Sequence, residues 1–158
     1  MRYHVHPALH FQVQIERWKD KFSRSTDSGR KTYCQNILSE LNQDDAQFQK
    51  VREAFRNYGL GMVLKSWKNW CVIIKDYDPP TFYRFQVFNE SGLVAHCVRQ
   101  SSDAILLEAF QAGFREVDSS NALHRLSRTP KWNRRQVSHV MPLALHSVNQ
   151  PLQGVFPC

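Results

Sequence analysis

Apolar positions in the N-terminal part of the chain recur mostly at helical spacing. The clearest helix has four apolar residues on one face, at Phe48, Val51, Phe55 and Tyr58. This i, i+3, i+7, i+10 spacing is typical of an amphipathic helix, and Gly59 is expected to end it. A shorter helix is predicted over residues 30–41. Residues 42–45 form a polar break, in which Asp44 or Asp45 would cap the next helix.

Residues 8–22 fit two periods at once. Every second residue is apolar at Leu9, Phe11, Val13 and Ile15, which is the two-residue period of a strand. A second apolar set recurs at i, i+4, i+7 and i+11, the spacing of one helix face, and consists of Phe11, Ile15, Trp18 and Phe22. Leu9 and Val13 would fall off the helical stripe, so the pattern favours a strand in the first part of this segment.

The middle of the chain has the pattern of a small sheet. Short apolar strands are predicted at residues 71–74, 82–88 and 93–98, and 82–98 is predicted as one hairpin closed by Gly92. A serine then caps a helix over about 102–114. The predicted fold class is α+β: N-terminal helices, then a small antiparallel sheet with one helix on one face.

Length and composition indicate one folded domain. A chain of 158 residues with 42% hydrophobic residues has the size and apolar content of a single core. Its three parts would be a mainly helical segment 1–66, a strand-strand-strand-helix unit 67–118 and an extension 119–158. No apolar run is long enough to cross a bilayer and no secretory leader is evident, so we expect a cytoplasmic protein without a membrane.

The charge is distributed unevenly. No acidic residue follows Asp118, and the extension 119–158 supplies five of the seven net positive charges through Arg125, Arg128, Lys131, Arg134 and Arg135. Such an asymmetry favours a polyanionic partner. Arginine matches phosphate geometry, and Trp132 within the segment could stack on a base. The alternative is a solvated basic surface with Trp132 buried as an anchor.

Two weaker candidates involve the sheet and the N-terminus. Aromatic and cationic residues interleave along 65–88, and we expect the strand face that carries Arg84 to be exposed and available to a nucleic acid. If the N-terminus is extended, His4, His6 and His10 point to one face and are weak candidates for a metal site. No motif of a cofactor-binding protein is present, and the four cysteines include no C-x-x-C pair.

Three hypotheses of function follow. The first is a non-enzymatic protein that binds nucleic-acid phosphates through the basic segment. The second is an adaptor or inhibitor that uses the same residues on an acidic protein surface. The third is a small metal-dependent hydrolase or nuclease that uses the N-terminal histidines. Whether the chain is an enzyme stays open, although the residues favour a binding protein.

Overall fold

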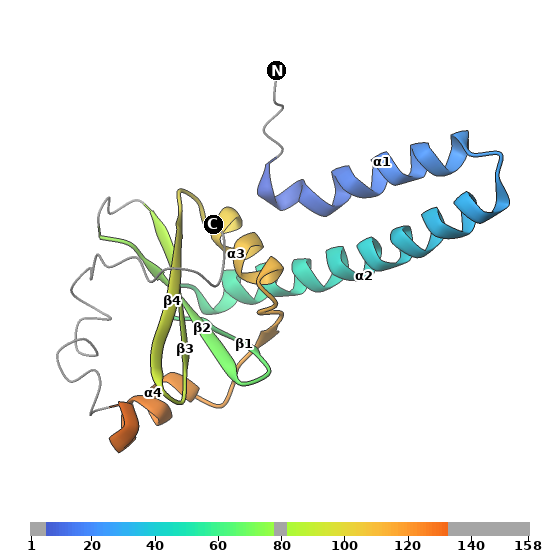
Figure 1. Ribbon diagram of the computed structural model, residues 1–158. Coiled ribbons are helices and arrows are strands. Elements are labelled where there is room, and N and C mark those ends of the chain that lie inside the picture. Colours follow the sequence, from blue (N-terminus) through green and yellow to red (C-terminus); the bar gives the residue numbers. More distant parts are fainter. Residues whose placement is uncertain (1–5, 78–81, 133–158) are drawn as a thin grey trace. The chain divides into compact units, whose positions relative to one another are not determined.

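The chain is described here by a computed structural model that covers residues 6–77 and 82–132 (Figure 1). Contacts within the chain divide it into two compact units, Met1–Lys50 and Val51–Cys158. Each unit is described by itself, and the prediction of a single domain stays a prediction. The α+β fold class is confirmed, since helices at the N-terminus precede a five-stranded antiparallel sheet and further helices.

The first unit consists of one helix and most of a second, whose last turns belong to the second unit. A 3-10 turn at Pro7–Leu9 leads into α1 (His10–Arg24), which is followed by α2 (Ser28–Tyr58). The prediction of a strand in residues 8–22 is therefore wrong. Phe11 and Ile15 lie on the buried stripe of α1, and the Phe11 ring meets that of Phe48 at 5.6 Å between centroids. Leu9, which does not fit the stripe, stays 48% exposed, so the helical period explains burial better than the strand period.

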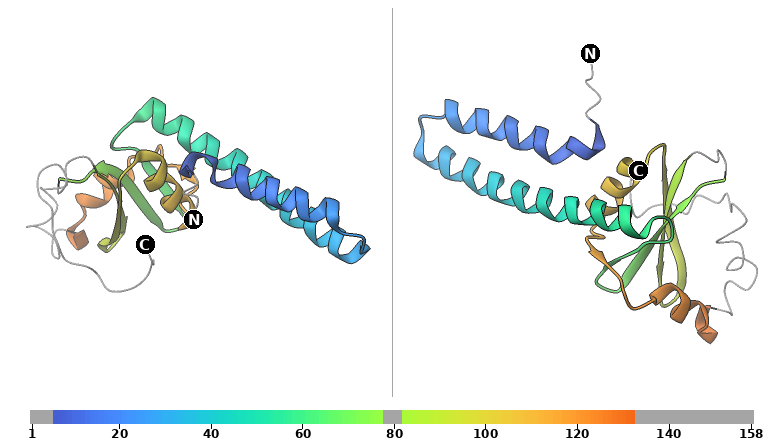
Figure 2. Two further views of the ribbon diagram at one scale, coloured as in Figure 1. Left: turned by 90° about the horizontal axis from the view of Figure 1, so that it is seen from above. Right: turned by 180° about the vertical axis from the view of Figure 1, so that it is seen from behind.

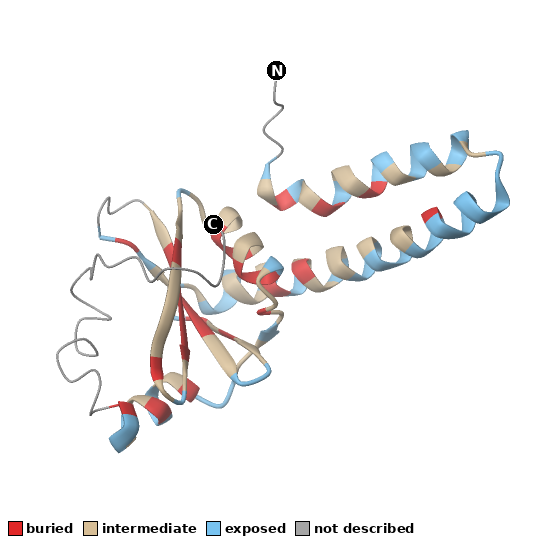
Figure 3. Cartoon of the chain, in the orientation of Figure 1, coloured by how far each residue is buried: buried red, intermediate tan, exposed pale blue. Residues whose placement is uncertain are grey.

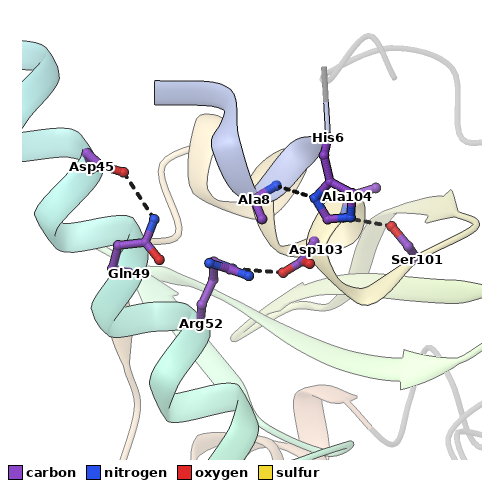
Figure 4. Close-up of polar contacts among 8 residues, drawn as sticks. All are labelled: His6, Ala8, Asp45, Gln49, Arg52, Ser101, Asp103 and Ala104. Atoms are coloured by element: carbon purple, nitrogen blue, oxygen red, sulfur yellow. Dashed lines mark hydrogen bonds and ion pairs between the residues drawn. The ribbon is translucent and has the colours of Figure 1, made fainter. Parts of the chain in front are cut away.

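The predicted polar break at 42–45 is also wrong, because α2 continues through it. The side-chain amide of Asn42 donates to the carbonyl of Leu38 at 2.6 Å. Gln49 Nε2 donates to Asp45 Oδ1 at 3.1 Å, a bond that Figure 4 shows. Both bonds link residues one helical turn apart, so these polar side chains support the helix rather than cap a new one.

The ends of α2 follow the expected local chemistry. Asp27 Oδ1 accepts a hydrogen bond from the Arg30 amide at 2.7 Å, which satisfies a free donor of the first turn. Gly59 has a φ of +71° and its amide donates to Phe55, so the predicted glycine stop is confirmed. Within the described ranges, no helix combines the length and the apolar character needed to cross a membrane.

The second unit contains the sheet. Its strand order is β4-β3-β2-β1-β5, and the strands are β1 (Val63–Ser66), β2 (Asn69–Lys75), β3 (Tyr83–Asn89), β4 (Gly92–Arg99) and β5 (Glu116–Val117). The predicted hairpin is confirmed as β3 and β4, with Asn89 opposite Gly92 and a φ of +117° at Gly92. The short strands β1 and β5 were not predicted, because four and two residues are too few to show a period.

One face of the sheet packs on α3 (Ser102–Gln111). The Phe85 ring on β3 lies 6.3 Å from that of Phe114, which follows α3, and both are buried. Ser101 Oγ accepts from the Ala104 amide at 3.2 Å, so the predicted serine cap is confirmed. Arg52 Nε donates to Asp103 Oδ1 at 2.8 Å, which joins the last turns of α2 to α3 (Figure 4).

The opposite face of the sheet is also covered. A second cluster of buried residues joins it to α4 (Ala122–Ser127), and its members are Val72, Phe88, Ala122, Leu126 and Trp132. Figure 2 shows α3 and α4 in separate places around the sheet, and Figure 3 marks the buried positions along the strands. The interior strand β3 is buried at five consecutive positions, Arg84 to Phe88, and so on both of its faces.

Candidate nucleic-acid interface

The basic segment begins with a helix anchored through its apolar side. Ala122 and Leu126 are one turn apart on α4, and both are buried against the sheet. After the helix, Thr129 donates to the Leu126 carbonyl through its amide at 3.0 Å and its hydroxyl at 2.8 Å. The Trp132 amide donates in turn to the Thr129 carbonyl at 3.1 Å. These bonds define the backbone path from Ala122 to Trp132.

Trp132 is a structural anchor rather than an exposed stacking surface. Its side chain is fully buried, and its ring meets Phe88 edge to face at 5.9 Å. The indole N–H donates to the Asn89 carbonyl at 2.6 Å, so the one polar atom of the side chain is satisfied. The geometry of Trp132 therefore fits a buried anchor, and we no longer propose that its ring stacks on a base.

The cations of the same segment point away from this core. Arg125, Arg128 and Lys131 are all exposed, and none of them forms an ion pair with any residue that the structure describes. We call these three residues the α4 basic surface. Arg134 and Arg135 lie outside the described residues. The α4 basic surface therefore presents three positive charges on a backbone held by a buried tryptophan.

Asp118 holds the start of α4. Its carboxylate accepts from Ser120 Oγ at 2.7 Å and from the Ala122 amide at 3.2 Å. Asn121 between them has a φ of +53°, a conformation that asparagine tolerates. Burial raises the pKa of Asp118, but the hydrogen bonds from Ser120 and Ala122 outweigh it, so the pKa lies below its ordinary value.

This lowered pKa predicts acid sensitivity of α4. A carboxylate whose pKa is lower in the folded state stabilises the fold above about pH 3.9, the usual aspartate value, and the contribution is lost as the pH falls through the folded pKa. Asp118→Asn should therefore be less stable than the wild type at pH 7, and the difference should shrink below about pH 4. Urea unfolding from pH 7 to pH 3 measures both. A constant difference across that range would show that Asp118 is not held as an ion.

Arg84 does not join the α4 basic surface. It is buried, and its Nη2 donates to the buried Asp76 Oδ1 at 2.8 Å. The prediction that its face of β3 is exposed is wrong, because Gln86 and Phe88 on that face are buried as well. β3 is an interior strand that is buried on both faces, and the aromatic residues at both odd and even positions of 82–88 were the sequence signal for this.

The histidine candidates are not gathered by a strand. His6 precedes the 3-10 turn and its Nδ1 accepts from the Ala8 amide at 3.2 Å, whereas His10 is in α1 and hydrogen-bonds Gln14 at 2.8 Å. His4 lies outside the described residues. Among the residues that are described, no three or more histidine, cysteine or carboxylate side chains are grouped so that they could hold a metal ion. The metal-site hypothesis required an extended segment in which alternate side chains share one face. Because α1 begins at His10, this segment is not extended throughout, and the hypothesis loses its geometric basis.

One exposed aromatic residue that the sequence did not single out lies at the end of the sheet where Trp132 contacts Asn89. Trp67 is 86% exposed in the two-residue turn between β1 and β2. Trp70, shortly after this turn, is paired with Phe88, shortly before the β3–β4 turn. The two turns therefore lie at one end of the sheet, where Trp132 also contacts Asn89. Figure 1 shows the β1–β2 turn and α4 at the same end.

Comparison with protein-family models, with curated proteins and with solved structures finds no match to this chain. Its function is therefore inferred from its own residues.

Proposed function

We propose that this protein binds nucleic acid through phosphate contacts made by the α4 basic surface, extended by Arg134 and Arg135. The observation that carries the proposal is the exposure of Arg125, Arg128 and Lys131 without an ion-pair partner among the described residues. Three such charges on one short segment attract a polyanion, and the guanidinium groups of two of them match phosphate geometry.

The anchoring of the segment supports this proposal. A flexible basic tail loses conformational entropy when it is ordered on a ligand. Here the buried Trp132, with its bond to Asn89, already holds the backbone that carries the three cations. Preorganised cations bind phosphates at a lower entropic cost, so the anchor makes a binding role more favourable than a loose charged surface.

The first test is the dependence of binding on salt. Each phosphate that a cation neutralises contributes about −0.7 to the slope of log K against log salt for single strands and about −0.9 for duplexes. Five contacts predict a slope of about −3.5 to −4.5. Fluorescence anisotropy with a labelled oligonucleotide between 50 and 200 mM salt, concentrations at which phosphate binding changes strongly, measures the slope.

A charge variant assigns the slope to residues. Arg125→Ala, Arg128→Ala and Lys131→Ala combined should flatten the slope by about 2 to 3. The matched control removes three exposed cations of α2, Arg30, Lys50 and Arg56, and changes the net charge equally. If the control variant weakens binding as much as the α4 variant, only net charge matters and the α4 basic surface is not the binding site.

An acidic protein surface is the competing partner for the same three residues. Nuclease treatment before a pull-down with the full chain separates the two, because only a protein partner survives it. Recovery of one discrete protein, together with an absence of oligonucleotide binding at low salt, would replace the nucleic-acid proposal with the adaptor one.

A further inference from the structure

The β1–β2 turn carries the most exposed large apolar side chain in the described part of the second unit. Trp67 is 86% exposed, and its backbone has a φ of +49°. Ser66 pairs with Asn69, so Trp67 and Lys68 are the two central residues of a tight hairpin turn. Such turns favour glycine or asparagine where φ is positive, since a bulky side chain is strained there. Neither the exposure nor the backbone conformation of Trp67 stabilises the fold, so an indole at this position is consistent with a contact to a ligand.

The surroundings of Trp67 favour a nucleobase over an apolar pocket. Lys68 Nζ lies 4.9 Å from the centre of the Trp67 ring. An ammonium group over an exposed indole ring suits a ligand that carries a flat ring next to a phosphate. The neighbouring residues Ser66 and Asn69 are polar. The flanking positions Lys65 and Lys68 are cationic, so every residue within two positions of Trp67 in the sequence is polar.

The position of the turn connects it to the α4 basic surface. The β1–β2 and β3–β4 turns lie at the same end of the sheet, and Trp132 bonds to Asn89 in the second of them. Two strand spacings, about 10 Å, separate the middles of the two hairpins. Trp67 and the segment anchored by Trp132 therefore lie at the same end of the sheet, an arrangement that suits one oligonucleotide contacting both.

We infer that Trp67 is a stacking platform for an unpaired base, and that the protein prefers single-stranded over double-stranded nucleic acid. This inference rests on the proposed function, because the α4 basic surface supplies the phosphate contacts. A base inside a duplex is already stacked between its neighbours and is not available to the indole without being flipped out. Phosphate contacts alone do not distinguish strongly between the two forms, so the stacking contact supplies the preference.

The test compares single-stranded and duplex oligonucleotides of one sequence, with binding measured by anisotropy on the full chain. Trp67→Gly should weaken binding to the single strand about 5- to 150-fold, the range for loss of one base stack, and leave duplex binding within about twofold. Trp67→Phe should lie between the wild type and the glycine variant. Tyr58→Ala is the control, because Tyr58 is also an exposed aromatic residue, 69% exposed, at the end of α2.

The glycine variant also separates a ligand role from a structural one. Glycine adopts a positive φ freely, so Trp67→Gly should fold at least as stably as the wild type while it binds the single strand less well. A variant that binds weakly because it is unfolded would instead show a lower unfolding midpoint, and Trp67→Phe then carries the comparison.

The outcomes distinguish this inference from the proposed function. If Trp67→Gly binds the single strand as tightly as the wild type while the α4 charge variant loses binding, Trp67 is not a stacking platform and the proposed function stands. Equal weakening for single strand and duplex also overturns the inference. If the wild type binds neither oligonucleotide at low salt, both ideas fail. A protein captured after nuclease treatment by the wild type but not by Trp67→Gly would assign the indole to a protein pocket instead.

Discussion

Replacing Trp132 with alanine is expected to lower the free energy of unfolding of the second unit by about 3–5 kcal/mol, the usual cost of deleting a large buried aromatic side chain. The side chain is fully buried, meets Phe88 edge to face and donates to the Asn89 carbonyl at 2.6 Å. The alanine variant loses the packed area and the hydrogen bond together. It also leaves the Asn89 carbonyl without this donor.

Urea unfolding followed by circular dichroism measures this loss. Trp67→Phe is the matched control, because it removes a tryptophan that is 86% exposed and should change the unfolding free energy by less than about 0.5 kcal/mol. A cost below about 1 kcal/mol for Trp132→Ala would mean that the anchor is not packed as described.

The same variant should affect binding without removing a charge. If Trp132 holds the α4 basic surface in place, its loss allows Arg125, Arg128 and Lys131 to move, and binding then requires the segment to be ordered again. Trp132→Phe retains most of the packing and should bind more tightly than Trp132→Ala. Identical binding by the two variants would show that the cations act without the anchor.

Removing Asp76 is expected to cost about 3–5 kcal/mol, because it leaves the buried Arg84 charge without its partner. Arg84 Nη2 and Asp76 Oδ1 are 2.8 Å apart, with side-chain exposures of 11% and 6%. Arg84 Nε has no hydrogen-bond partner among the residues that the structure describes, so Asp76 is the partner there that compensates the guanidinium charge. Thermal and urea unfolding of Asp76→Ala measure the loss.

Two further variants test the cause. Asp76→Leu combined with Arg84→Met removes both charges and should be far less destabilising than Asp76→Ala alone, since no uncompensated charge remains. Glu116→Ala breaks the exposed pair between Lys65 and Glu116, 3.2 Å apart, and should cost no more than about 1 kcal/mol. If Asp76→Ala costs no more than Glu116→Ala, the pair between Asp76 and Arg84 is effectively solvated.

His96 gives an independent signal of this buried pair. The pKa of His96 lies below its ordinary value, first because the side chain is partly buried and second because of the Arg84 charge, while Asp76 acts in the opposite direction. Asp76→Ala should therefore lower the pKa of His96 further, and Arg84→Met should raise it. Titration of the imidazole by NMR measures both shifts, and opposite signs are the expected pattern.

Several elements of the second unit can be predicted from the sequence, because hairpin turns and helix caps depend on residues that are close together in the chain. The hairpin at 82–98 was predicted from two alternating runs around Gly92, and the helix after it from a serine cap and an apolar stripe. The end of α2 at Gly59 follows from the same local chemistry. The strand expected within 8–22 and the break at 42–45 were wrong. There, the packing of Phe11 on Phe48 and side-chain bonds within α2 outweighed weak local preferences.

Some features of the candidate site are likewise determined by the sequence alone, and others only by the tertiary structure. The sequence alone determined that the positive charge is concentrated after Asp118, because charge is a property of composition. Only the tertiary structure decided that Trp132 is the anchor and that Arg84 is buried with Asp76. It also decided that Trp67 lies at the same end of the sheet as α4. Burial and proximity depend on contacts between residues far apart in the chain, and no local pattern of side chains encodes them.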